Sequence, residues 1–317
     1  MHRCRSGGVG RALALTLAFL VPLGLVACGK PQPADNAAAS QSASSVAPRA
    51  EGAPQIVTSA DGVHIEYHVY GSGDPAIVLV HGWSCDSNYW KEQIEALKTS
   101  YTTVTVDLAG HGASGRNRTD WSMGNFGEDV AAVARQLQNG RVVLVGHSMG
   151  APVVLEAARR IGDRVIGIIA VDSLKTIGQP PMPEAQIEKV LEPFRADFIG
   201  HTREFVTGSF FQPDADPAFV QKVAYDMSLS PPEVAVPAMQ SLLRMDFAQV
   251  LPEIRVPVVA INASNGMPAD IPRIRKSLPR FRAVTLDNTG HFLMMEAPDR
   301  FNSVLLAEIE SIVGKTD

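Results

Sequence analysis

Short, continuously apolar segments rich in β-branched residues recur along the chain and constrain its fold more than any other feature. Stretches of helical pattern separate them. Strands that are apolar at every position are covered on both faces, and strand–helix alternation favours parallel pairing. The sequence therefore predicts an α/β fold with a mostly parallel central sheet and helices on both faces. The expected strands are Val63–Gly71, Ala76–Gly82, Thr102–Leu108, Arg141–Ser148, Val165–Ser173, Val256–Asn262 and Phe281–Asn288, and the expected helices are Asn88–Lys98, Asn125–Gln138, Gly150–Ile161, Ile271–Leu278 and Pro298–Val313.

This alternation stops between Leu174 and Ile254, where Pro-rich turns and helical pieces contain no convincing strand. The stretch "SPPE" at Ser230–Glu233 has the capping-box pattern, which predicts a helix that begins with Ser230 as its N-cap. We expect residues 174–254 to form a helical lid, inserted between two late strands, over the carboxyl edge of the sheet. Most of its Phe and Met residues should pack within the lid, and a few should face the site.

The N-terminus has the pattern of a secretory signal peptide at residues 1–27, in which a basic start precedes the apolar run Ala12–Ala27. The run is short for a membrane-spanning helix, although an anchor that stays attached is an alternative. "LVAC" at Leu25–Cys28 resembles a bacterial lipobox, in which the signal is cut before Cys28 and this cysteine is lipidated. Residues 28–54 are rich in Ala, Ser, Pro and Gln without an aromatic residue, which predicts a flexible tether. The folded domain should then span residues 55–317.

These features predict an exported protein, anchored by lipid to a bacterial membrane and facing the periplasm. Gly29 follows Cys28, and the absence of Asp there favours the outer membrane in the lipoproteins that this segment resembles. Once Cys4 leaves with the signal and Cys28 carries lipid, Cys85 alone remains, so no disulfide can form within the chain. We expect Cys85 to be a small buried residue. Nothing in the sequence indicates an oligomeric state.

The charge of the chain argues against a nucleic-acid-binding protein, and the spacing of its potential metal ligands argues against a metalloprotein. The net charge is −5, and the only basic run is Arg273–Lys276, so the electrostatic footprint of a nucleic-acid-binding protein is missing. No group of histidine, cysteine or acidic residues has convincing metal-ligand spacing. We therefore expect no nucleic-acid partner, no metal and no cofactor.

The segment "VVLVGHSMGAP" carries the motif G-x-S-x-G at Gly146, Ser148 and Gly150. The motif is meaningful between an apolar strand and a helix, and both are expected here. The glycines allow a sharp turn that pushes the serine hydroxyl out of the backbone path. This context predicts that Ser148 is a nucleophile.

The chain resembles the α/β-hydrolase fold family over nearly all of residues 55–315. The segments that carry the resemblance are "VLVHGWSCDSNYW", "VDLAGHGASG", "VGHSMGAP" and "DNTGHFLMMEAPDRFN". The resemblance implies that the backbone N–H groups of Trp83 and Met149 form an oxyanion hole, which a developing oxyanion needs. It also implies structural roles for His81, His111, Asp107 and Ser114.

His291 follows the last strand in "TGHF", and the glycine before it frees the loop to point the imidazole inward. Its position after Ser148 fits the chain order serine, acid, histidine. As general base it would take the serine proton and later deliver it to the leaving group. Other histidines have simpler interpretations: His147 should point away from the site, and His201 should lie in the lid.

The identity of the acid that would orient His291 is open. The family resemblance places it just after the strand that ends at Asn262, where the sequence has Ala263–Gly266 and reaches an acid only at Asp270. Asp172 ends the preceding strand of the expected sheet, and some family members, including several haloalkane dehalogenases, place their acid there. Asp172 is the preferred candidate, Asp270 is the fallback, and a site without an acid is the third possibility. Asp287 lies too close to His291 along one strand to reach the imidazole.

A serine nucleophile excludes the dehalogenase and epoxide-hydrolase chemistries of this family, which need an aspartate. The sequence therefore predicts a serine hydrolase, esterase-like or lipase-like, that cleaves carboxylic esters of small to medium hydrophobic molecules through an acyl-enzyme intermediate. One alternative is a carbon–carbon bond hydrolase with the same triad. Another is a lipid-anchored binding or sensing protein with a vestigial triad.

Overall fold

The computed structural model describes residues 50–314. The predicted signal peptide, Cys28 and most of the predicted tether lie outside these residues. The described chain begins slightly before the predicted domain start at residue 55. The N–H of Gly52 donates to the carbonyl of Val69 at 2.9 Å, and the first strand, β1, begins at Pro54.

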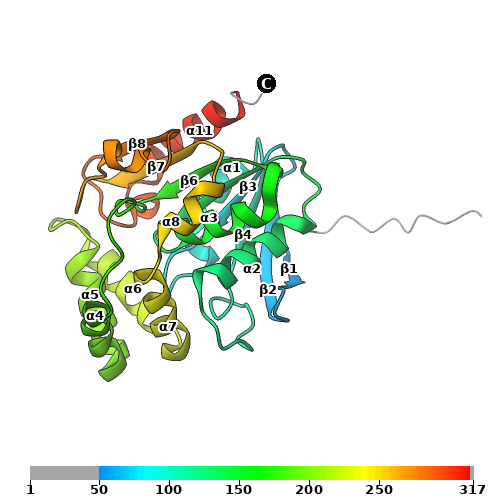
Figure 1. Cartoon of the computed structure of the whole chain (residues 1–317). Helices are drawn as coiled ribbons and strands as arrows, with labels where there is room; N and C mark the ends of the chain where they lie inside the picture. Colours follow the sequence, from blue (N-terminus) through cyan, green and yellow to red (C-terminus); the bar gives the residue numbers. More distant parts are fainter. Residues whose placement is uncertain (1–49, 315–317) are drawn as a thin grey trace, which may run out of the picture. The chain divides into compact units, whose positions relative to one another are not determined.

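The described residues form an eight-stranded sheet in the order β1-β2-β4-β3-β5-β6-β7-β8 (Figure 1). β1 pairs antiparallel with β2, β2 pairs antiparallel with β4, and every other neighbouring pair is parallel. β3, β4, β5, β6 and β7 are buried at every position, as their continuous apolar sequences predict. The strands are β1 (Pro54–Thr58), β2 (His64–Tyr70), β3 (Ala76–Val80), β4 (Thr102–Val106), β5 (Val142–His147), β6 (Val165–Val171), β7 (Val258–Ala263) and β8 (Phe281–Leu286).

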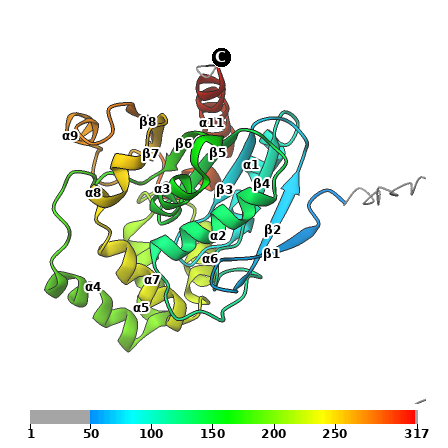
Figure 2. The ribbon, with the colours of Figure 1, turned by 45° about the vertical axis from the view of Figure 1, so that its right-hand side comes forward.

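Helices cover both faces of the sheet, so the predicted α/β architecture is confirmed (Figures 1 and 2). On one face, α2 (Met123–Gln136) and α3 (Gly150–Ile161) pack against each other, with α3 contacting β3, β5 and β6. On the other face, α1 (Lys91–Leu97) contacts β4, and α11 (Pro298–Val313) contacts β6 and β7. The shorter elements are η1 (Ser87–Trp90), η2 (Gly162–Arg164), α9 (Ile271–Arg275) and α10 (Leu293–Glu296).

A group of helices connects β6 to β7, within the range predicted for the lid. α4 packs against α5 and α7, α5 packs against α6, and α7 also contacts α2. The predicted start of α7 is wrong: the helix begins at Pro232 with Pro231 in extended conformation, and no side chain caps it. Pro232 disfavours helical geometry at the residue before it, Pro231. Pro232 also lacks an N–H group that could donate a hydrogen bond to the Ser230 hydroxyl. The elements are α4 (Glu184–Ala196), α5 (Phe198–Ser209), α6 (Pro217–Ser228), α7 (Pro232–Leu243), α8 (Phe247–Val250) and η3 (Leu251–Glu253).

Between residues 50 and 314, no helix has both the length and the apolar character needed to cross a membrane.

Candidate active site

Ser148 lies in the sharp turn between β5 and α3, in the left-handed region at φ 52°. Its N–H donates to the carbonyl of Val171 at 2.9 Å, which ties the turn to β6. The flanking glycines are needed because the backbone approaches them closely. A Cβ on Gly146 would lie 2.3 Å from the carbonyl oxygen of Gly150, and a Cβ on Gly150 would lie 2.5 Å from that of Val80. The spacing of the motif thus reflects a strand and a helix in direct contact around a strained serine.

The loop after β3 lies against this serine. A Cβ on Gly82 would be 3.2 Å from the Cβ of Ser148. The next residue, Trp83, donates its indole N–H to the carbonyl of Ala235 at 2.7 Å, which ties this loop to α7. Among the hydrogen bonds of the described residues, none engages the backbone N–H of Trp83 or of Met149. Neither N–H is thus occupied by an acceptor of the described chain, and the role that the resemblance implies for them as oxyanion donors stays a prediction.

His291 and Asp172 are in direct contact: His291 Nδ1 lies 2.6 Å from Asp172 Oδ2. The second carboxylate oxygen, Oδ1, accepts from the N–H of Ala263 at 3.0 Å and lies 2.7 Å from Lys175 Nζ. Burial raises the pKa of Asp172, but the hydrogen bond and charge of His291, together with Lys175, lower it by more, so the pKa lies below its ordinary value. The ionised carboxylate keeps the proton on Nδ1, which leaves Nε2 of His291 as an acceptor.

The other candidate acids lie elsewhere. Asp270 caps α9 by accepting from the N–H of Arg273 at 3.0 Å, and its side chain is 48% exposed beside the same guanidinium. Asp287 is exposed. The structure therefore brings Asp172, and neither Asp270 nor Asp287, to His291. The segment Ala263–Gly266 has no acid, but the backbone N–H of Ala263 donates to the acid that follows the neighbouring strand. The catalytic roles of these residues stay predictions.

His147 has a role that the sequence interpretation missed. Its Nε2 donates to the backbone carbonyl of His291 at 2.9 Å. Burial, and next the charge of His291, lower the pKa of His147 to about 3, so it is neutral near pH 7. Nothing in the sequence signals this contact, because β5 and the loop after β8 meet only in the fold.

Glu296 was also missed. Its carboxylate accepts from the N–H of Gly290 at 2.7 Å and from that of Phe292 at 3.1 Å. Glu296 therefore binds the backbone on both sides of His291. Burial raises the pKa of Glu296, and these two hydrogen bonds oppose the rise. The glutamate is close to His291 in sequence, but its contacts depend on the turn formed by α10.

Several residues that the resemblance made structural do brace the site. Asp107 accepts from the N–H of Ser87 at 2.8 Å and from that of Ala113 at 3.0 Å. Ser114 donates to the carbonyl of Asp107 at 2.6 Å. Cys85 is buried, and burial raises its thiol pKa well above the ordinary value, so it is not a thiolate.

Aromatic side chains connect the oxyanion loop with the histidine. The ring of Trp83 packs edge-on against Phe194 at 5.5 Å between centroids. Phe205 follows at 5.5 Å from Phe194 and Phe210 at 5.0 Å from Phe205. Phe210 stacks on the imidazole of His291 at 4.4 Å. His201, predicted to lie in the lid, packs against Phe194. Aromatic rings from α4 and α5 thus lie beside the candidate catalytic groups, with Phe194 buried and with Phe205 and Phe210 half-buried.

In the part of the chain that the structure describes, no group of three or more histidine, cysteine or acidic residues is arranged to hold a metal ion.

Residues 77–304 match the model of the Alpha/beta hydrolase family. The chain belongs to this family. The family membership agrees with the sheet order, the strained serine turn and the His291–Asp172 contact described above. It makes the protein a member of a hydrolase family.

Known proteins similar to this chain include two hydrolases and a solved esterase. Over 102 residues the chain is 34% identical to a 2-(acetamidomethylene)succinate hydrolase of Mesorhizobium japonicum, a match that spans 32% of this chain and 36% of that relative. It is 25% identical over 260 residues to a pimeloyl-[acyl-carrier protein] methyl ester esterase of Vibrio atlanticus, covering 76% of this chain and 96% of the relative. The structure of a thermophilic esterase from Thermogutta terrifontis resembles the fold with a TM-score of 0.72 at 24% identity, covering 82% of this chain and 99% of the esterase.

Proposed function

We propose that this protein is a serine hydrolase that cleaves carboxylic esters of small to medium hydrophobic molecules. The observation that carries the proposal is the contact of His291 Nδ1 with Asp172 at 2.6 Å, in the same sheet edge as a serine held at φ 52°. An imidazole fixed in this tautomer can accept the serine proton. The esterases among similar proteins support the same chemistry.

The reaction follows from these groups. His291 takes the proton of Ser148 as Oγ attacks the ester carbonyl, and the N–H groups of Trp83 and Met149 stabilise the oxyanion that forms. Collapse of the tetrahedral intermediate breaks the bond to the alcohol, which leaves with the proton from His291, and an acyl-enzyme remains. Water then attacks the acyl carbon, gives its proton to His291 and releases the acid as Ser148 regains its proton.

The half-buried rings of Phe205 and Phe210, which lie next to His291, support a hydrophobic acyl group. Aromatic rings offer a large apolar contact area to a substrate, and they provide no hydrogen-bond partner for a charged substituent on its acyl group. We therefore expect activity to rise from acetate to butyrate esters and to fall for chains too long for the lid.

The test measures hydrolysis of p-nitrophenyl acetate, butyrate and octanoate by the wild type, Ser148→Ala and the matched control Ser303→Ala, whose serine is exposed on α11. We expect Ser148→Ala alone to lose turnover, and a phosphonate probe to add its mass to Ser148 in the wild type. Equal rates in the wild type and Ser148→Ala, or labelling at another residue, would refute the proposal.

We also propose that the protein is exported and anchored through a lipidated Cys28, which only the N-terminal sequence supports. Cell fractionation of the wild type and Cys28→Ser, together with labelling by a palmitate analogue, tests this. Membrane recovery and labelling should both disappear in Cys28→Ser. A wild type without label would contradict the anchor while leaving the esterase proposal untouched.

A further inference from the structure

The turn between α5 and α6, residues 210–216, lies directly against the loop that carries His291. The N–H of His291 donates to the carbonyl of Phe210 at 2.6 Å. A Cβ on Gly290 would lie 2.4 Å from the same carbonyl oxygen, so only glycine allows the two backbones to come this close. The ring of Phe210 stacks on the imidazole of His291 with 4.4 Å between the centroids and 27° between the planes. The α5–α6 turn therefore covers one face of the candidate base.

Two side-chain amides hold this turn in place. Gln212, within the turn, donates from Nε2 to the carbonyl of Thr289 at 3.1 Å. Asn265, in the loop after β7, donates from Nδ2 to the carbonyl of Phe211 at 3.1 Å. One bond runs from the turn to the histidine loop, and the other runs from the β7 loop to the turn. The α5–α6 turn is thus attached to two of the segments around the site.

Asn265 gives a function to the segment in which the acid is missing. The family resemblance would place the acid in residues 263–266, but Asp172 contacts His291 instead. Within this segment the N–H of Ala263 donates to Asp172. The side chain of Asn265 binds the turn whose first residue stacks on His291. The segment therefore acts on the histidine in two ways, through the acid and through the α5–α6 turn.

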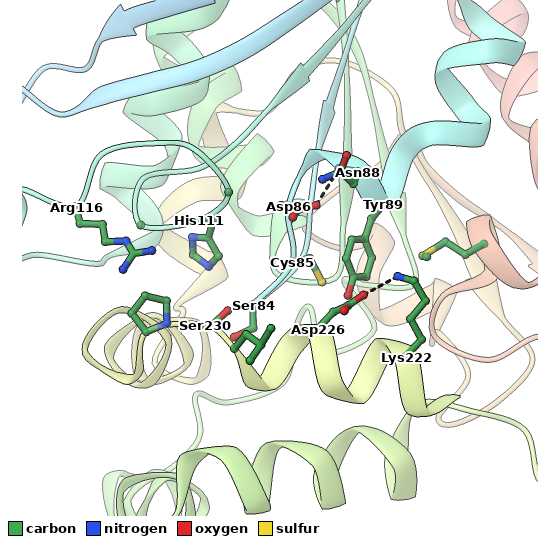
Figure 3. Close-up of a pocket in the computed structure, with 15 residues that line it drawn as sticks. Ser84, Cys85, Asp86, Asn88, Tyr89, His111, Arg116, Lys222, Asp226 and Ser230 are labelled. Carbon is green, nitrogen blue, oxygen red and sulfur yellow. Dashed lines mark hydrogen bonds and ion pairs between the residues drawn. The ribbon is translucent and has the colours of Figure 1, made fainter. Parts of the chain in front are cut away.

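This close attachment is local to the turn. The next helix, α6, borders a cavity of about 510 Å³ that is lined by Tyr89 and Asp226 among others, but by no residue between 210 and 216 (Figure 3). Asp226 pairs with Lys222 of the same helix at 2.6 Å. A cavity thus lies beside part of α6, whereas the turn before α6 contacts the histidine loop directly.

We propose that Gln212 and Asn265 are positioning residues, which hold the ring of Phe210 on the imidazole of His291. The inference rests on the proposed serine-hydrolase function and extends it to the α5–α6 turn. Stacking on one face restricts the orientations of the imidazole and favours the one in which Nε2 takes the proton of Ser148. The aromatic face also lies next to the positive charge that His291 gains with this proton, and such a face stabilises a cation.

Kinetics of Gln212→Ala and Asn265→Leu with p-nitrophenyl butyrate test the proposal. Both side chains are only half-buried, so the variants should fold. We expect kcat to fall by about threefold to tenfold in each variant with KM nearly constant, because one hydrogen bond of this order is lost and it acts on the base. Gln240→Ala is the matched control. It removes an amide hydrogen bond from Nε2 to Glu188 at 3.1 Å, between α7 and α4, and should leave kcat and KM unchanged.

The proton resonances of His291 report the stacking without any substrate. A proton above the face of an aromatic ring is shifted upfield. The imidazole C–H resonances of His291, assigned by their absence in His291→Ala, should therefore move downfield when Phe210→Leu removes the ring. Gln212→Ala and Asn265→Leu should move the same resonances in the same direction, and Gln240→Ala should not.

The two measurements distinguish a failure of this inference from a failure of the proposed function. A wild type that hydrolyses no ester would refute the hydrolase proposal, while resonances that move as expected would still support the positioning of His291. Unmoved resonances in both amide variants would overturn the inference, as would a wild-type kcat in both. A rise in KM with unchanged kcat would also overturn it, because the amides would then serve substrate binding. An equal loss of kcat in Gln240→Ala would do so as well, because any loosened contact among these helices would then have the same effect.

Discussion

Replacement of Asp172 by asparagine tests the arrangement around His291 most directly. In the wild type, Asp172 Oδ1 accepts from the N–H of Ala263 and faces Lys175, while Oδ2 accepts from His291 Nδ1. The N–H of Ala263 and the Lys175 ammonium are both donors, so an asparagine at position 172 would turn its carbonyl oxygen toward them. Its NH₂ group would then face the imidazole of His291. Nδ1 of His291 must then accept, which moves the ring proton to Nε2.

An imidazole with its proton on Nε2 cannot take the proton of Ser148. Changing this tautomer in a serine triad lowers turnover by about 10⁴-fold, which corresponds to about 5.4 kcal/mol at about 1.36 kcal/mol per tenfold. We expect kcat for p-nitrophenyl butyrate to fall by this order in Asp172→Asn. KM should change little, because the acid does not touch the acyl group.

Asp270→Asn is the matched control. Asparagine caps helices as well as aspartate, so the N-cap of α9 is retained. The lost charge removes only a half-exposed ion pair with Arg273, worth about 0–1 kcal/mol. We expect activity within about twofold of the wild type, a change too small to resolve as a catalytic loss. A larger loss in Asp270→Asn than in Asp172→Asn, or less than a tenfold loss in Asp172→Asn, would refute the reasoning.

Three further outcomes are expected. Lys175→Met removes the positive charge next to Asp172, which strengthens the pairing of the carboxylate with protonated His291. The acidic limb of kcat/KM against pH should then move to higher pH by roughly half a unit to one unit, Lys175→Arg should restore it, and an unmoved limb would contradict this. Gly150→Ala places a Cβ 2.5 Å from the carbonyl oxygen of Val80, so urea unfolding should show a loss of at least about 2 kcal/mol. The lowered pKa of Asp172 means that its stabilising contribution is present above its unfolded pKa of about 4 and is lost as the pH falls through the folded value. The difference in unfolding free energy between the wild type and Asp172→Asn should therefore shrink below about pH 4, and a difference that grows on acidification would rule this out.

The strand pattern predicted most of the sheet because burial on both faces leaves a direct mark on the sequence. β3, β5 and β6 lie within their predicted segments, and α3 matches its predicted bounds. β1 was missed because the short edge strand "PQIVT" has no buried position and therefore no apolar run. The start of α7 was misplaced because a local pattern, "SPPE", was interpreted without the backbone restriction that the second proline imposes.

The sequence by itself determined the candidate nucleophile and base, because Ser148 and His291 each stand in a local pattern of glycines and strand ends. It reduced the acid to a short set of carboxylates and favoured Asp172 over Asp270, but the local pattern did not decide between them. That choice depends on which strand ends are neighbours and where their loops turn. Only the tertiary structure brings Asp172 to 2.6 Å from His291 while Asp270 caps a helix.

The tertiary structure alone also decided what surrounds these groups. The contact of His147 Nε2 with the backbone carbonyl of His291 joins two strand ends that are far apart in the chain. The physical reason is that covalent spacing controls local turns, whereas hydrogen bonds and ion pairs at the edge of a parallel sheet depend on strand order. The segment Ala263–Gly266 shows this difference: it has no acid in the sequence, and in the fold the backbone N–H of Ala263 donates to Asp172, which follows the neighbouring strand.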